Sequence, residues 1–308
     1  MARERFDFSE FVPDDTNGKS AFGHGHPRGL DLRPDVPGST RELTGVDLTH
    51  LIHTHDVAAA KGGGGGGNGG GGGGGGGTTF APYTTPGAAS SVFNITVEFK
   101  GTWTQDFHDI FVNSANRLAD LIVGEIPNVT VSGKGKPRTV DDIVISAELG
   151  AIDGAGGILG QAGPTSVRTA SSLPATAIMQ FDVVDASAMG LQAFSLVVLH
   201  EMSHSLGFGS IWDRIGLVDN GLFTGDSANA EYVAMGGSPA GIPIEQDGGG
   251  GTAGSHWDEE TFGNELLTGY LDSGQNYFTA MSAASFDDLG YVITPNYRDW
   301  ADDGYILA

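Results

Sequence analysis

The sequence LQAFSLVVLHEMSHSLGFG, residues 191–209, predicts an α-helix that is buried on all sides. Apolar residues surround its polar positions so completely that such a helix belongs inside the protein. His200 and His204 are four positions apart and project from one face, with Glu201 one step round the helix. Gly207 can adopt the left-handed conformation that ends a helix and turns the chain. Two imidazoles and a neighbouring carboxylate on a buried helix indicate a metal site.

A third ligand has to come from elsewhere, because catalytic zinc usually has three protein ligands and one open position for water. Downstream of the helix the chain has one histidine, His256, in the segment GSHWDEETFGNELLTG. A single buried histidine such as His204 is usually a core residue with a satisfied hydrogen bond. The combination instead predicts zinc bound by His200, His204 and His256, with Glu201 as the catalytic residue.

Three segments together resemble the leishmanolysin-like zinc metallopeptidases, which belong to the metzincins. They are HEMSHSLGFGSIWD at 200–213, SHWDEETFGNELLTG at 255–269 and FTAMSAASFDDLGY at 278–291. Compact metzincins place the third ligand six residues after the second, where this chain has Ser210, whereas leishmanolysins carry an insertion there. The chain has no cysteine, unlike eukaryotic leishmanolysins, so the resemblance is to a bacterial type without cysteines.

The resemblance implies an α+β, metzincin-like zincin fold. Its twisted mixed sheet lies over the active-site helix, and a loop-rich C-terminal subdomain follows. The pattern from Val92 onward agrees with this fold, since a strand-like segment, a helix-like segment and two further strand-like segments precede residue 191. Met281 matches the methionine turn of the family, with a short helix expected over 285–291. Ala283 stands where some metzincins carry a tyrosine ligand.

The resemblance also implies the activity of a zinc-dependent endopeptidase, in which Glu201 activates a zinc-bound water. Its substrate would be a protein or peptide in an extended conformation, paired with the edge of the sheet. An alternative is a secreted calcium-binding adhesion or interaction module in which zinc is only structural. A zinc amidase acting on a non-peptide substrate is a third interpretation.

A calcium site is a further expectation. The segment IDGAGGILGQAGP, residues 152–164, resembles the calcium loop of the matrixins, although Gln161 replaces their zinc-binding histidine. The ligands carried over from that loop are Asp153, Gly154, Gly156, Ile158, Asp182 and Asp185. Six oxygens suit Ca²⁺. A tight glycine turn followed by solvated acidic residues is the other interpretation.

The composition restricts the classes of molecule that the protein can bind. The 308 residues carry a net charge of -23 with only 15 Lys and Arg, which argues against nucleic acid and anionic membranes as partners. No apolar run approaches the roughly 20 residues of a membrane span, so we expect no transmembrane segment. The acidic composition is typical of a secreted or extracellular protein, although no signal peptide is recognisable at the start.

The domain organisation follows from a glycine run. Residues 1–61 are polar, and we expect them to be propeptide-like or partly disordered, with a short amphipathic helix over 43–60. Residues 62–90 read as a flexible glycine-rich linker. Residues 91–308 form the expected catalytic domain, divided into subdomains at 91–209 and 210–308.

Overall fold

The computed structural model describes residues 4–5, 45–47, 77–87, 92–132, 136–156, 158–247, 251–272 and 274–307. Its largest sheet has six strands in the order β2-β8-β9-β7-β4-β3. These strands are β2 (Gly45–Asp47), β3 (Tyr83–Thr84), β4 (Ile95–Lys100), β7 (Ile143–Gly150), β8 (Gly160–Arg168) and β9 (Pro174–Asp182). Strands β4, β7 and β9 are parallel, whereas β2, β3 and β8 are antiparallel to their neighbours. The expected α+β class with a mixed sheet is therefore confirmed.

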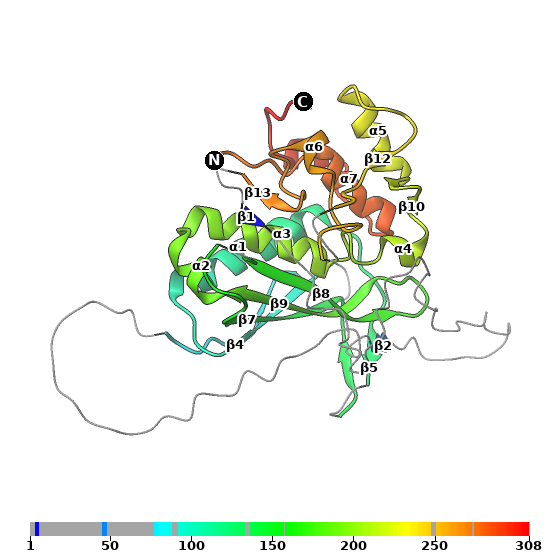
Figure 1. Cartoon of the computed structure of the whole chain (residues 1–308). Helices are drawn as coiled ribbons and strands as arrows, with labels where there is room; N and C mark the ends of the chain where they lie inside the picture. Colours follow the sequence, from blue (N-terminus) through cyan, green and yellow to red (C-terminus); the bar gives the residue numbers. More distant parts are fainter. Residues whose placement is uncertain are drawn as a thin grey trace, which may run out of the picture.

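Two long helices lie on one face of this sheet (Figure 1). They are α1 (Gln105–Leu121) and α3 (Leu191–Ser205). The Thr104 side chain caps α1 by accepting a hydrogen bond from the backbone N–H of Phe107. The rings of Phe111 on α1, Phe181 on β9 and Phe194 on α3 meet edge to face, with centroids 5.3–6.2 Å apart. This aromatic cluster fixes both helices to the sheet.

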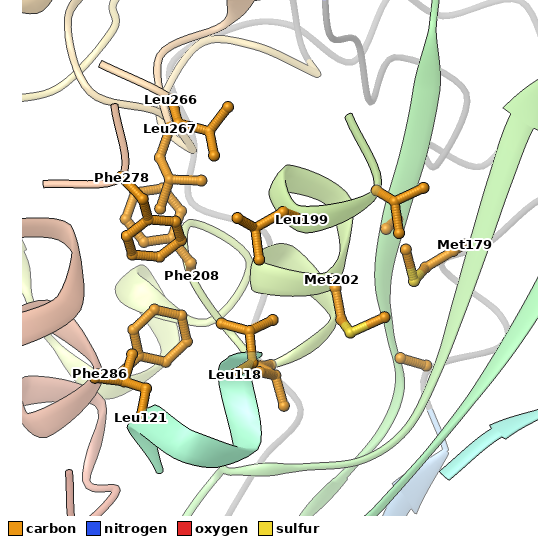
Figure 2. Packing of buried hydrophobic residues seen from close by; sticks show 14 of the residues in the cluster. Leu118, Leu121, Met179, Leu199, Met202, Phe208, Leu266, Leu267, Phe278 and Phe286 are labelled. Atoms are coloured by element: carbon orange, nitrogen blue, oxygen red, sulfur yellow. The ribbon is translucent and has the colours of Figure 1, made fainter. Parts of the chain in front are cut away.

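From Val197 onward helix α3 is buried on both sides, as its sequence predicts, whereas Leu191 and Gln192 in its first turn are exposed. Every residue from 197 to 205 is buried. Figure 2 shows Met202 of α3 near Met179 of the sheet, and Leu199 on the side that faces Phe278 and Leu266 of the C-terminal part. The helix thus lies between two layers, which explains its apolar character all round.

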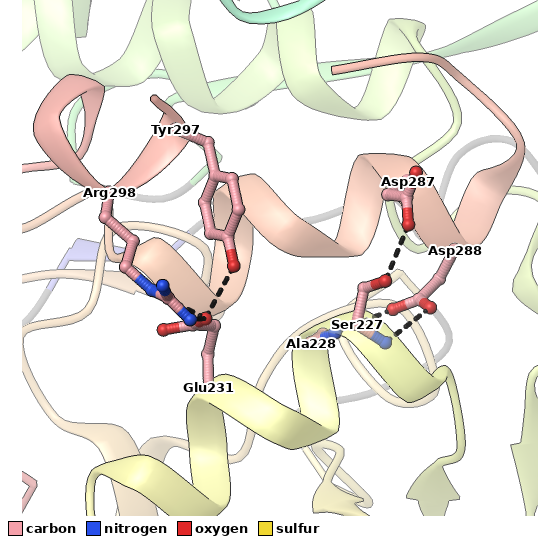
Figure 3. A network of polar contacts seen from close by, with 7 residues as sticks. All are labelled: Ser227, Ala228, Glu231, Asp287, Asp288, Tyr297 and Arg298. Atoms are coloured by element: carbon pink, nitrogen blue, oxygen red, sulfur yellow. Dashed lines mark hydrogen bonds and ion pairs between the residues drawn. The ribbon is translucent and has the colours of Figure 1, made fainter. Parts of the chain in front are cut away.

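The C-terminal part consists of short elements joined by loops. They are α4 (Trp212–Ile215), β10 (Val218–Asp219), β11 (Leu222–Phe223), α5 (Asp226–Ala234), β12 (Ile242–Pro243), α6 (Glu259–Phe262), β13 (Tyr270–Leu271), α7 (Ala280–Leu289) and α8 (Tyr297–Trp300). Polar contacts join α5 to α7 and α8 (Figure 3). Asp288 of α7 accepts hydrogen bonds from the backbone N–H groups of Ser227 and Ala228, both at 2.9 Å. Glu231 of α5 accepts from Arg298 and Tyr297, both at 2.6 Å.

Several elements differ from the sequence-based expectations. Residues 45–47, predicted to be helical, form strand β2 on the edge of β8; the rest of the 43–60 helix lies outside the described residues. Pairing with β8 outweighs a weak local helical pattern. The sequence also missed β8 itself, the hairpin of β5 (Val129–Val131) and β6 (Arg138–Val140), and α2 (Val183–Ala188). A two-residue strand β1 (Glu4–Arg5) pairs with β13.

The end of the expected linker and the start of the expected C-terminal helix also differ in the structure. Residues 77–87, which the expected division assigns to the linker, pack against the sheet: β3 pairs with β4, and the Phe80 ring stacks on His108 at 4.2 Å. The helix expected over 285–291 begins earlier, at Ala280, because Thr279 caps its first turn. Met281 therefore lies inside α7. No helix within the described residues has both the length and the apolar character needed to cross a membrane.

Candidate metal centre

Three imidazole rings from two distant parts of the chain meet at one point. The Nε2 atoms of His200 and His204 are 2.9 Å apart, and His256 Nε2 lies 3.2 Å and 3.1 Å from them. All three side chains are completely buried. The structure therefore brings together the three histidines singled out in the sequence, although 52 positions separate His204 from His256.

The Nδ1 atom of each of the three rings lies within hydrogen-bond distance of a backbone carbonyl oxygen. His200 Nδ1 lies 2.8 Å from Leu266 O, His204 Nδ1 lies 2.8 Å from Phe208 O, and His256 Nδ1 lies 3.0 Å from Thr252 O. A carbonyl oxygen can only accept, so the Nδ1 atoms carry the protons. In this tautomer the three Nε2 lone pairs converge, an arrangement that a cation stabilises.

The lowered pKa values of the histidines also favour neutral rings that can bind a metal ion. Burial and the neighbouring imidazoles hold the pKa of His200 and of His204 well below the usual range, so both rings are neutral at pH 7. Neutral imidazole is the form that binds metal ions.

The spacing fits zinc. Two nitrogens bonded to a tetrahedral zinc ion at about 2.0–2.1 Å are roughly 3.3–3.4 Å apart. The observed Nε2 separations of 2.9–3.2 Å lie a few tenths of an ångström inside that value. The metal-binding side chains that meet in this cluster, within the described part of the chain, are the three histidines. The donor set fits a zinc site with three protein ligands, and zinc binding itself stays a prediction.

Close backbone packing allows His256 to reach the helix. Gly209 has a φ of +68°, and a Cβ atom there would overlap the carbonyl oxygen of Ser255. Gly207, with a φ of +112°, ends α3 as predicted. Next to His256, the buried Trp257 ring packs against Phe208 with centroids 5.0 Å apart. The loop is thus fixed on both sides of the histidine.

Glu265 is a buried polar group that the sequence did not single out. Its carboxylate accepts hydrogen bonds from the Thr279 hydroxyl at 2.9 Å, from the Ser282 hydroxyl and from the backbone N–H of Leu267. Burial raises the pKa of Glu265 to about 7, despite these donors. The contacts tie residues 265–267 to the start of α7. They thereby fix the Leu266 carbonyl on which His200 rests.

Glu201 lies beside this cluster on α3. It is completely buried, and neither of its carboxylate oxygens has a hydrogen-bond partner among the described residues. Burial therefore raises its pKa well above the usual range. A buried carboxyl group without hydrogen bonds is costly to keep. Met281, which matches the methionine turn of the family, is buried in the core cluster that includes Met202.

A cavity of about 770 Å³ opens beside the first half of α3. Its lining includes Leu196, one helical turn before His200, and Leu271 of β13. The ion pair between Arg117 and Asp302, 2.9 Å long, forms part of its wall. None of the three histidines lines this cavity, and neither does Glu201.

The structure does not support the expected calcium site. The carboxylates accept hydrogen bonds from loop N–H groups: Asp182 from Ile152 at 2.7 Å and Gly154 at 3.1 Å, Asp185 from Gly156 at 2.8 Å, and Asp153 from Ile158 at 3.0 Å. Burial alone would raise the pKa of Asp182, but these donors hold it below the usual value. The loop thus presents amide hydrogens, rather than carbonyl oxygens, to the acidic groups. Within the described residues no cluster of three metal-binding side chains lies at this loop.

Comparisons with known proteins agree with the sequence resemblance. A family profile described as leishmanolysin matches residues 237–298, which include His256 and Met281. A leishmanolysin homolog of Crithidia fasciculata is 34% identical over 111 residues, which cover 30% of this chain and 16% of the relative. Leishmanolysins of Leishmania donovani and Leishmania major are 26% and 28% identical over 132 and 133 residues, each match covering 38% of this chain and 22% of the relative. The match thus spans at most about a fifth of each relative. Within that span, the predicted resemblance of this chain to the leishmanolysin-like metallopeptidases is confirmed.

Proposed function

We propose that this chain is a zinc-dependent endopeptidase that hydrolyses peptide bonds with Glu201 as its general base. The observation that carries the proposal is the convergence of the His200, His204 and His256 Nε2 atoms within 2.9–3.2 Å of one another, one residue along the helix from a buried carboxyl group. A structural zinc site is normally closed by four protein ligands. Three histidines leave one position for water or substrate.

Zinc, when bound by the three histidines, would lower the pKa of a bound water towards about 7 and polarise the carbonyl of the scissile peptide bond. Glu201 would accept the proton of the attacking water and pass it to the leaving amine. The positive charge of the metal would favour the ionised form of this buried carboxyl group, which burial alone disfavours.

The substrate would bind as an extended strand. Among the described residues, β2 pairs with β8 from Ser166 to Arg168, at the far end of β8 from Gly160. The Gly160 end lies beside Glu201. A peptide that paired with this end of β8 would be held by its backbone, with its scissile bond close to Glu201.

The proposal extends to the family properties expected from the sequence. Residues 91–308, together with residues 77–87 that pack on the sheet, would form a metzincin-type catalytic domain with subdomains at 91–209 and 210–308. Residues 62–76 would form a linker, and residues 1–61 a propeptide-like region. The protein would act outside the cell, as a secreted enzyme on protein or peptide substrates.

Zymography on casein, with and without a zinc chelator, tests the activity. We expect clearing that the chelator removes and added zinc restores. Glu201→Gln should retain one zinc ion per chain and lose clearing. A zinc-loaded wild-type protein that cleaves neither casein nor a peptide library would overturn the proposal and favour a structural zinc site in an interaction module. Cleavage of non-peptide amides alone would favour an amidase.

A further inference from the structure

The backbone of Gly160 lies directly against the carboxyl group of Glu201. A Cβ atom built on Gly160 would come within 3.0 Å of both Cγ and Oε1 of Glu201, and within 3.1 Å of Cδ1 of Phe181. Nonbonded carbon atoms pack best at about 3.5–4.0 Å. Gly160 does not have a positive φ, so what matters at this position is the missing side chain.

The two neighbours differ in their freedom to move. Phe181 is the cross-strand partner of Gly160, is completely buried, and packs edge to face against Phe111 and Phe194. Such a ring cannot shift without disturbing the core. Glu201 has a flexible side chain, and no hydrogen bond to a described residue holds its carboxylate. A side chain at position 160 would therefore displace Glu201 and leave Phe181 in place.

We propose that Gly160 is a positioning residue for Glu201. By carrying no side chain, it leaves the space in which the carboxylate faces the attacking water. This inference rests on the proposed peptidase function for its kinetic consequence, but the displacement of Glu201 can be measured independently of activity.

Gly160→Ala in the full-length, zinc-loaded protein is the test. Gly150→Ala is the matched control: Gly150 ends strand β7 of the same sheet, does not have a positive φ, and nothing lies within 4 Å of an added Cβ. A misplacement of about 1 Å can cost roughly a hundredfold in rate. We expect Gly160→Ala to lower kcat by about ten- to a hundredfold, with KM and zinc content unchanged, and Gly150→Ala to behave like the wild type.

A double-mutant cycle separates positioning from a general loss of structure. Glu201→Asp shortens the side chain by one methylene and relieves the overlap with an alanine at position 160. Its cost in kcat should therefore be smaller in the Gly160→Ala background than in the wild type. Effects of the two changes that multiply independently would overturn the proposal.

Crystal structures of the wild type and of Gly160→Ala supply the readout that does not need activity. We expect the Glu201 carboxylate to move while the Phe181 ring and the three histidines keep their positions. An unmoved Glu201, with the strain taken up by Phe181 or by the β8 backbone, would overturn the proposal. This holds whether or not the wild type cleaves peptides, so the two proposals can fail separately.

Discussion

The Nδ1 atom of His200 lies 2.8 Å from the backbone carbonyl oxygen of Leu266, a residue 66 positions further along the chain. This contact joins the buried helix to the loop that follows His256. It orients the imidazole so that its Nε2 lone pair faces the other two rings. The geometry of the candidate metal centre therefore depends on how firmly the C-terminal part holds residues 265–267.

Removing the Glu265 carboxylate should weaken both the fold and the metal site. Glu265→Ala leaves the buried donors of Thr279, Ser282 and Leu267 without their acceptor. We expect the free energy of unfolding to fall by about 3 kcal/mol and zinc affinity to fall by roughly 10- to 100-fold, because the Leu266 carbonyl loses its support. Urea unfolding and chelator competition measure the two effects. Glu260→Ala, at an exposed position of α6, is the control and should change stability by less than about 0.5 kcal/mol.

Adding a methyl group to Gly209 should move the third ligand. The new Cβ would overlap the Ser255 carbonyl oxygen, so the loop carrying His256 has to shift. Gly216 is a matched control, since its φ of +74° is similar but nothing lies within 4 Å of an added Cβ. Both alanine variants pay the cost of a left-handed backbone, about 1–2 kcal/mol. Only Gly209→Ala should also lower zinc affinity, by tenfold or more, in a chelator titration. Equal zinc affinity in the two variants would show that the contact with Ser255 does not position His256.

Stability should depend on pH through Asp142. Burial raises the pKa of this carboxyl group to about 7, although it accepts hydrogen bonds from the backbone N–H groups of Asn94 and Ile126. Between about pH 4 and pH 7 the folded protein then holds a proton that the unfolded chain releases. The stabilisation is fully present below about pH 4 and is lost as the pH rises through 7.

Urea unfolding between pH 5 and pH 8 checks this dependence. The low pKa values of His200 and His204 contribute a slope of the opposite sign below about pH 6.5, so the comparison with a variant isolates Asp142. Between pH 5 and pH 8 the free energy of unfolding of the wild type should decrease relative to that of Asp142→Asn. The exposed Asp120→Asn is the control and should keep the slope of the wild type. An unchanged slope in Asp142→Asn would mean that other groups cause the pH dependence. Glu265 is one such group, because its pKa is raised in the same direction as that of Asp142.

What the sequence revealed was mostly local or carried by a family motif. The apolar surroundings of His200 and His204 predicted a helix buried on both sides, and the segment around His256 predicted where the chain returns. Glu265 and Gly160 gave no such signal, because their partners lie in other elements: Glu265 contacts α7, and Gly160 contacts α3. Only the folded chain brings these groups together.

The calcium expectation finds no support in the structure for a related reason. A glycine turn followed by aspartates is compatible with two opposite arrangements. In one the loop carbonyls and the carboxylates share a cation, and in the other the loop N–H groups donate to the carboxylates. The direction of each peptide group decides between them, and residue types do not encode it. In this structure the Gly154 and Gly156 amides point towards Asp182 and Asp185.

Anomalous diffraction at the zinc edge, from crystals of the full chain grown with zinc, tests the metal centre most directly. The proposed function predicts one strong peak at about 2.0–2.1 Å from the Nε2 atoms of His200, His204 and His256, with no fourth protein ligand. A peak elsewhere, a fourth protein ligand closing the site, or no peak among the three rings would contradict a catalytic zinc centre.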